Sequence, residues 1–168
     1  MEDRYLFRGK RIDNGEWVKG NLIRSNDAEV GYEAMIIPTN DSNMYTKGGS
    51  KGDLGFENWF QVDKNTICQC TGLKDKNGKL IFESDILMCH GNPKELAKVV
   101  FGKFAVIDAE TLESIDEVIG WYYEVIPTDN LSKCEPFCLS MPLTEEYVKA
   151  CEFEVVGSVF DNPELLEV

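Results

Sequence analysis

The chain has 168 residues, 43% hydrophobic and 28% charged, which is the balance of a folded protein rather than a disordered one. Its 17 basic and 30 acidic residues give a formal net charge of −13, which repels phosphate backbones and argues against general nucleic-acid binding. The sequence shows neither a membrane-length apolar stretch nor a signal-peptide pattern at its start. We therefore expect a cytosolic protein without a membrane partner, in which the six cysteines stay reduced.

The first predicted element is a β-hairpin over residues 4–24. Its turn is predicted at Asn14-Gly15, a pair that accepts the positive φ angles of both central positions of a type I′ turn. A strand is expected over residues 32–37, ended by a proline. Residues 39–55 are polar and rich in glycine, so we expect a flexible insertion there.

The middle of the chain predicts several short strands joined by tight turns. Residues 66–71 alternate with a period of two, which puts Cys68 and Cys70 on one face of a strand. A second Asn-Gly turn is expected at Asn77-Gly78. Further short strands are predicted over residues 59–62, 79–82 and 86–89.

The last part of the chain predicts two longer strands, one helix and a final strand. The long strands are expected over residues 98–108 and 117–126, and the final strand over 153–160. A hydroxyl cap followed by two acids predicts a short helix over Thr144–Ala150. The sequence thus predicts a mostly β fold, with a small barrel-like or strongly bent antiparallel sheet and one short helix near the C-terminus. We expect a single domain over residues 1–168, with the insertion near 39–55 and a C-terminal tail at 161–168.

The stretch from Thr66 to Leu87, TICQCTGLKDKNGKLIFESDIL, resembles the central signature of the YopX proteins of phages and prophages. The early segments FRGK and GEWV resemble the start of that family, and EVVGSVFDNPELL near the C-terminus resembles its end. The resemblance implies an all-β fold, a phage or prophage origin and self-assembly, but no known reaction and no catalytic residue. Ser84 stands where the family usually has glycine, which counts against a left-handed backbone there.

The cysteines and the single histidine do not predict a metal or catalytic site. Zinc favours four nitrogen or sulfur ligands in closely spaced pairs, and no such finger pattern emerges. Cys89 adjoins His90, but neighbouring residues of a strand point to opposite faces, so the two side chains are not expected to meet. We therefore expect no metal, no cofactor and no catalytic residues, and we do not expect an enzyme. The other cysteine pairs lie on unlike elements, Cys68 with Cys70 on a strand and Cys134 with Cys138 in a loop.

The remaining candidate is an interaction surface near the two ends of the chain. The first hairpin is locally basic, and an exposed basic face can contact phosphate or an acidic patch of a sister subunit. Strand alternation places Tyr5 and Phe7 on one face of the hairpin and its arginines on the other. Two leucines form an apolar C-terminal end that can pack onto a neighbour. The candidate surface comprises Arg4, Arg8, Lys10, Arg11, Trp17, Leu165 and Leu166.

Our leading hypothesis is a non-enzymatic phage accessory protein of the host bacterial cytosol that forms homo-oligomers and binds a host or phage protein. The alternative is a nucleic-acid-linked role. That role is either DNA binding through the basic hairpin or mimicry of DNA charge that captures host DNA-binding proteins. A third class, a cysteine or metal enzyme, would require stoichiometric zinc or a reactive thiol.

Overall fold

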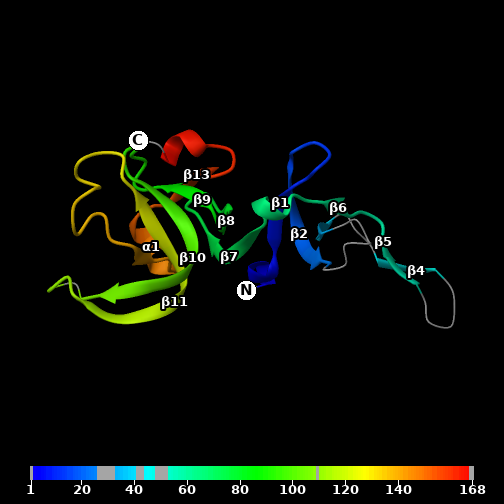
Figure 1. Ribbon diagram of the computed structural model, residues 1–168, viewed down its shortest axis with the longest axis horizontal. Coiled ribbons are helices and arrows are strands. Elements are labelled where there is room, and N and C mark those ends of the chain that lie inside the picture. Colours follow the sequence, from blue (N-terminus) through cyan, green and yellow to red (C-terminus); the bar gives the residue numbers. More distant parts are fainter. Residues whose placement is uncertain (1, 26–32, 41–43, 48–52, 109, 167–168) are drawn as a thin grey trace. The chain divides into compact units, whose positions relative to one another are not determined.

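The computed structural model describes residues 2–25, 33–40, 44–47, 53–108 and 110–166 (Figure 1). The chain divides into two compact units, Met1–Cys70 and Thr71–Val168. Antiparallel strands dominate both units, as the sequence predicts. A single domain spanning both units stays a prediction.

The first unit is built around the predicted N-terminal hairpin. Strands β1 and β2 pair in antiparallel register, with Phe7 opposite Gly20 and Lys10 opposite Trp17. A 3-10 helix at Glu2–Tyr5 precedes β1, so the predicted alternation of the side chains around Tyr5 is wrong. The strands are β1 (Phe7–Lys10), β2 (Trp17–Arg24), β3 (Ala34–Pro38) and β6 (Phe60–Gln61), in the order β6-β3-β2-β1.

The core of the first unit is small and lies on one face of these strands. Ala34, Ile36 and Val62 are buried at its centre. Phe7 and Val18 pack against them from the hairpin, which fixes that face of the hairpin toward the core. A 3-10 helix at Lys64–Thr66 then leads into the next strand.

The predicted insertion contains regular structure. Strand β4 (Met44–Lys47) and strand β5 (Asp53–Phe56) form a two-stranded antiparallel sheet. Two other parts of the predicted insertion, residues 41–43 and the glycine-rich residues 48–52, lie outside the described residues.

The two Asn-Gly turns occur where predicted, but the prediction that they are type I′ turns is wrong. Gly15 and Gly78 have φ angles of 74° and 81°, whereas Asn14 and Asn77 do not have positive φ. In the second turn the amide of Gly78 donates to the carbonyl of Asp75 at 2.9 Å. This is a type I turn followed by a left-handed glycine, the usual form of a three-residue hairpin loop.

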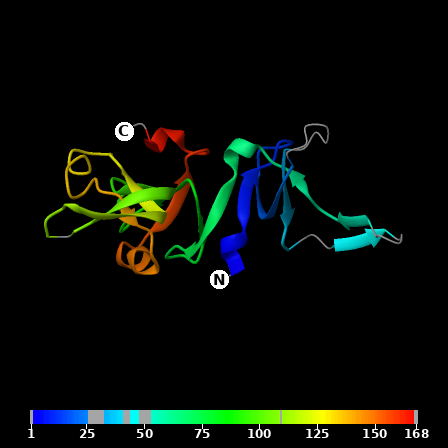
Figure 2. The same cartoon turned by 60° about the horizontal axis from the view of Figure 1, so that its bottom comes forward.

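The second unit contains a five-stranded antiparallel sheet in the order β12-β11-β10-β9-β13. Its two long strands, β10 and β11, are seen in Figures 1 and 2. Strand β7 begins in the first unit and continues into the second. Among the described residues each sheet has two edges, so none is closed into a barrel. The strands are β7 (Cys68–Lys74), β8 (Leu80–Phe82), β9 (Asp85–Met88), β10 (Leu96–Ile107), β11 (Ser114–Ile126), β12 (Met141–Pro142) and β13 (Glu154–Ser158).

The predicted helix is confirmed as α1 (Glu145–Ala150). The Thr144 hydroxyl accepts a hydrogen bond from the amide of Tyr147 at 3.2 Å and caps the helix. Val148 turns into the main core, which includes Leu87 and Phe153. The chain ends in a 3-10 helix at Pro163–Leu166. None of the described helices is long and apolar enough to cross a membrane.

Ser84 has a left-handed backbone, so the expectation that a serine at this position avoids that conformation is wrong. Its φ angle is 63°. The surrounding strands hold it there, because its amide donates to the carbonyl of Val99 at 2.9 Å and its carbonyl accepts from the amide of Val159 at 3.0 Å. These contacts offset the steric cost of a left-handed serine.

Asp75 is the buried polar residue that closes the β7–β8 turn. Its side chain is 6% exposed. One carboxylate oxygen accepts hydrogen bonds from the amides of Asn77 and Lys79, both at 2.9 Å. The other accepts from the amide of Val155 in β13 at 3.0 Å. The carboxylate therefore joins the turn to a strand 80 residues further along the chain.

The replacement Asp75→Asn is expected to lower the free energy of unfolding by about 1–3 kcal/mol, because the side-chain amide cannot accept at both positions and leaves a buried N–H unsatisfied. Urea unfolding followed by circular dichroism measures the change. The exposed substitution Glu113→Gln serves as the control and should leave the transition in place. Equal stability of the two variants would show that these hydrogen bonds contribute nothing.

Candidate functional site

Two basic residues of the hairpin, Arg8 and Lys10, lie beside one aromatic ring. The guanidinium carbon of Arg8 lies 4.4 Å from the centre of the Trp17 ring, and Nζ of Lys10 lies 5.6 Å from it. The side chain of Arg4 lies outside the described part of the structure. The structure thus brings Arg8 and Lys10 together on Trp17 as a cation–π group. That these residues form an interaction surface stays a prediction.

Arg11 is engaged within the hairpin. Its guanidinium forms two hydrogen bonds with the carboxylate of Asp13, at 2.9 and 2.5 Å. The hydrogen bond with Asp13 raises the pKa of Arg11 and lowers that of Asp13. The guanidinium carbon also lies 4.0 Å from the centre of the Phe60 ring. The charge of Arg11 is therefore largely balanced inside the first unit.

The two C-terminal leucines have different surroundings. Leu165 is half-buried and packs against Ile86, Leu96 and Ile126 of its own unit. Leu166 is 38% exposed. The apolar end predicted for contact with a neighbour is therefore reduced to one residue.

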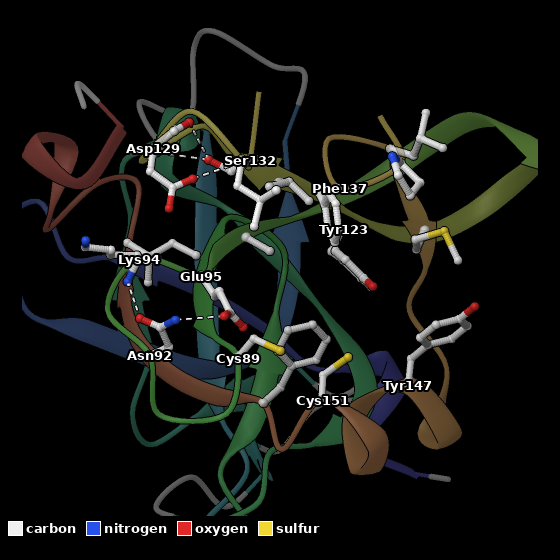
Figure 3. A pocket seen from close by; sticks show the side chains of 18 of the residues that line it. Cys89, Asn92, Lys94, Glu95, Tyr123, Asp129, Ser132, Phe137, Tyr147 and Cys151 are labelled. Carbon is white, nitrogen blue, oxygen red and sulfur yellow. Dashed lines mark hydrogen bonds between the residues drawn. The ribbon is translucent and has the colours of Figure 1, made fainter. Parts of the chain in front are cut away.

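The second unit contains a cavity of about 730 Å³ that is partly open to solvent (Figure 3). Its volume falls within the roughly 300–1,000 Å³ of small-molecule sites. Strands β10 and β11, the loop before β12 and helix α1 contribute to its wall. The apolar and aromatic lining includes Val125, Phe137, Leu139, Tyr147 and Phe153.

Two thiols lie near each other in the wall of this cavity (Figure 3). Burial raises the pKa of Cys89 to about 12, with smaller contributions from the neighbouring Cys151 and Glu95. Burial likewise raises the pKa of Tyr123, which also faces the cavity. Without a further partner, Cys89 is a protonated thiol at neutral pH and a weak nucleophile.

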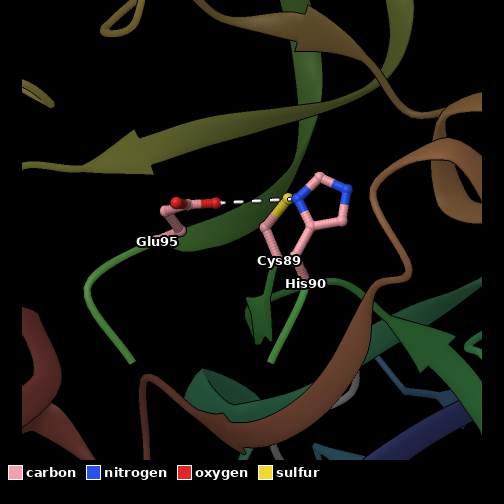
Figure 4. Close-up of side chains that lie close together, drawn as sticks. All are labelled: Cys89, His90 and Glu95. Carbon is pink, nitrogen blue, oxygen red and sulfur yellow. Dashed lines mark hydrogen bonds and ion pairs between the residues drawn. The ribbon is translucent and has the colours of Figure 1, made fainter. Parts of the chain in front are cut away.

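Cys89 and His90 meet side chain to side chain, so the expectation that they point apart is wrong (Figure 4). Strand β9 ends at Met88, and His90 has a φ angle of 49°, so strand alternation does not apply to this turn. The Cys89 sulfur lies 3.3 Å from Nδ1 of His90. One carboxylate oxygen of Glu95 lies 3.8 Å from the same nitrogen.

The sequence contains a signal for this turn, although strand alternation was assumed to extend through Cys89 and His90. Gly91, Asn92 and Pro93 follow His90, and such residues mark turns. These residues indicate a strand that ends before Cys89, and in a turn Cys89 can approach His90 and Glu95. Cys68 and Cys70 lie in strand β7 and are both buried, which agrees with the expectation that they share one face of a strand.

A family model described as YopX protein matches residues 6–167, which extends through both units. Among curated proteins, no sequence matches this chain. Among solved structures, the chain is similar to the crystal structure of protein EF1440 from Enterococcus faecalis. The two share 22% identity, with 95% of this chain and 96% of that chain covered and a TM-score of 0.49.

In metal-free protein at neutral pH, we expect a thiol reagent to label exposed Cys134 at least about tenfold faster than Cys89, because only the thiolate reacts. Labelling of Cys89 should rise as the pH passes from the ordinary value of 9.0 toward 12. Mass spectrometry of the labelled peptides measures both rates.

Unfolding in urea provides the control for this labelling, since it should make the two cysteines react at similar rates. Equal rates in the folded protein would contradict the burial of Cys89.

Proposed function

This chain belongs to the YopX family, and we propose that it is a non-enzymatic accessory protein of a phage or prophage that assembles with copies of itself. In this proposal it works in the cytosol of the host bacterium, where the assembled form binds a host or phage protein. The observation that carries the proposal is the outer part of the β10–β11 hairpin, residues 99–107 and 114–121, named the β10–β11 arm here.

The strands of the arm pair only with each other among the described residues. Strand β9 pairs with β10 at Leu96–Lys98, and β12 pairs with β11 at Tyr122 and Tyr123. The carbonyls of Val99 and Trp121, at the base of the arm, still accept from the amides of Ser84 and Leu143, both at 2.9 Å. Beyond these two residues both strands present open edges among the described residues. A two-stranded hairpin is marginally stable alone, so an arm of this length gains stability from any strand or face added to it.

One face of the arm is packed by its own aromatic side chains. The rings of Phe104 and Tyr122 stack with their centres 5.0 Å apart. They lie over Gly102 and Gly120, where a Cβ would be 3.7 Å from the Tyr122 ring and 3.8 Å from the Phe104 ring, respectively. This packing orders the arm from one side.

The opposite face of the arm is apolar and exposed. Phe101 lies opposite Trp121 and Lys103 lies opposite Ile119, so these four side chains share a face. Phe101 is 51% exposed and Ile119 is 74% exposed. Apolar side chains of this size, gathered on one strand face, are typical of contact surfaces.

The charges on this face suit a second copy of the chain. Lys103 forms an ion pair with Glu117 beside Ile119, so the patch carries one charge of each sign. Two copies related by a two-fold axis can exchange these partners, with Lys103 of each facing Glu117 of the other. The chain as a whole carries a net charge of −13, which opposes self-association through most other surfaces.

We expect wild-type protein at micromolar concentration to be a dimer or larger oligomer, and Ile119→Lys to weaken association at least about tenfold by placing charge in the apolar contact. Size-exclusion chromatography with light scattering measures the mass. The matched control is Ile12→Lys in the first unit, where the isoleucine is 58% exposed, and it should leave the mass unchanged. A wild type that is strictly monomeric would refute the proposal, and so would equal effects of the two substitutions.

A second candidate function is single-stranded or duplex DNA binding through the first unit. The observation in its favour is the grouping of Arg8 and Lys10 over Trp17, with Lys19 opposite Arg8 on the same strand face. Cations beside an aromatic ring are a common platform for nucleic-acid bases and phosphates.

This candidate predicts a salt-dependent shift of DNA mobility that Lys19→Glu weakens at least about fivefold, because Lys19 is exposed and its reversal repels phosphate. The control Lys133→Glu introduces the same charge change in the second unit. DNA that fails to shift at low salt would eliminate direct binding.

A further inference from the structure

The turn between β9 and β10, residues 89–95, is held in one conformation by its own backbone. The amide of Cys89 donates to the carbonyl of Glu95 at 2.9 Å, and the amide of Glu95 donates to the carbonyl of Asn92 at the same distance. The amide of Asn92 donates to the carbonyl of Cys89 at 2.8 Å. The amide of His90 anchors the turn from outside, donating to the carbonyl of Cys151 at 2.8 Å.

This turn brings three metal-ligating groups together (Figure 4). The Cys89 sulfur, a ring nitrogen of His90 and a carboxylate oxygen of Glu95 lie within 4.8 Å of one another. The sulfur is 3.3 Å from Nδ1 of His90, and the carboxylate oxygen is 3.8 Å from it. With zinc–ligand distances of about 2.0–2.3 Å, tetrahedral ligands lie roughly 3.3–3.8 Å apart. Both distances to Nδ1 therefore match the spacing of ligands around one metal ion, and the sulfur and the carboxylate oxygen lie no more than 4.8 Å apart.

Neighbouring groups orient two of these ligands. Nε2 of His90 lies 3.0 Å from the carbonyl of Ala150, and a carbonyl only accepts, so Nε2 carries the proton. Nδ1 then presents its lone pair toward Cys89 and Glu95. Asn92 donates to the other carboxylate oxygen of Glu95 at 2.7 Å and holds that side chain in place. Such outer hydrogen bonds accompany the histidine and carboxylate ligands of known metal sites.

We propose that Cys89, His90 and Glu95 bind a divalent transition metal of the zinc class. Thiolate and imidazole ligands favour zinc over magnesium or calcium. Three ligands from the chain leave a fourth position for water or an incoming donor. Cys89 and Glu95 also line the cavity, so the proposed metal site borders it. On binding, the Cys89 thiol loses its proton to the solvent and becomes the metal-bound thiolate.

The metal enters from solvent in this geometry. The side chains of His90 and Glu95 are 55% and 51% exposed, whereas Cys89 is half-buried. The competing interpretation is a metal-free cluster in which the Cys89 thiol donates to Nδ1 of His90. The two differ in one measurable property, which is tight stoichiometric binding of zinc that depends on all three side chains.

The test is titration of the full-length, chelator-treated protein with zinc alone, followed by calorimetry, and with cobalt, followed by absorption. We expect one zinc per chain and a thiolate-to-cobalt charge-transfer band. Cys89→Ser should abolish that band. Each of the substitutions Cys89→Ser, His90→Gln and Glu95→Gln should weaken zinc binding by more than about 100-fold, and Asn92→Ala by about 10- to 100-fold.

Matched controls are Cys134→Ser, an exposed cysteine of the same unit, and Glu110→Gln, an exposed acid outside the turn, and both should bind as the wild type does. Circular dichroism verifies that each variant is folded. Absence of zinc binding by the folded wild type would overturn the proposal and leave a hydrogen-bonded cluster only. Binding that survives Cys89→Ser, or that is lost in Cys134→Ser, would overturn it as well.

Discussion

A buried carboxylate joins two segments of the second unit that lie far apart in the sequence, the β7–β8 turn and the start of β13. Asp75 accepts from the amide of Val155, and the amide of Lys76 donates to the carbonyl of Phe153 at 2.9 Å. The same segment presents the carbonyl of Cys151 to the amide of His90. The turn at residues 89–95, which holds the proposed metal ligands, is therefore positioned by the segment 151–155, and Asp75 holds that segment in place. Releasing Asp75 is costly, because it is a buried acceptor with three amide partners.

The proposed binding and assembly surfaces occupy opposite ends of one strand. The turn at residues 89–95 leads directly into β10, and the β10–β11 arm begins only after Lys98. The core side chains Ala97 and Val99 lie at the junction between them. Since different side chains build each surface, metal binding and self-assembly are separate proposals, and either one can fail without the other.

The sequence predicted the elements whose signals are local. Alternation located β10 and β11, and the Thr144 hydroxyl followed by acids located α1. The proximity of Cys89 to His90 was missed because it depends on where β9 ends and on a left-handed residue in the turn. The contact of Asp75 with Val155 has no local pattern at all, since the two residues are 80 positions apart. Similarly, the carboxylate of Asp75 stabilises a type I turn where the Asn-Gly pair alone favours type I′.

Amide hydrogen exchange in wild type and in Asp75→Asn tests most directly whether Asp75 positions this turn. The account predicts that protection of the His90 and Val155 amides falls together in the variant, while the amides in the β10–β11 ladder next to the core keep theirs. Unchanged protection of His90, with Val155 alone exposed, would contradict it and would mean that the turn is held without the buried carboxylate.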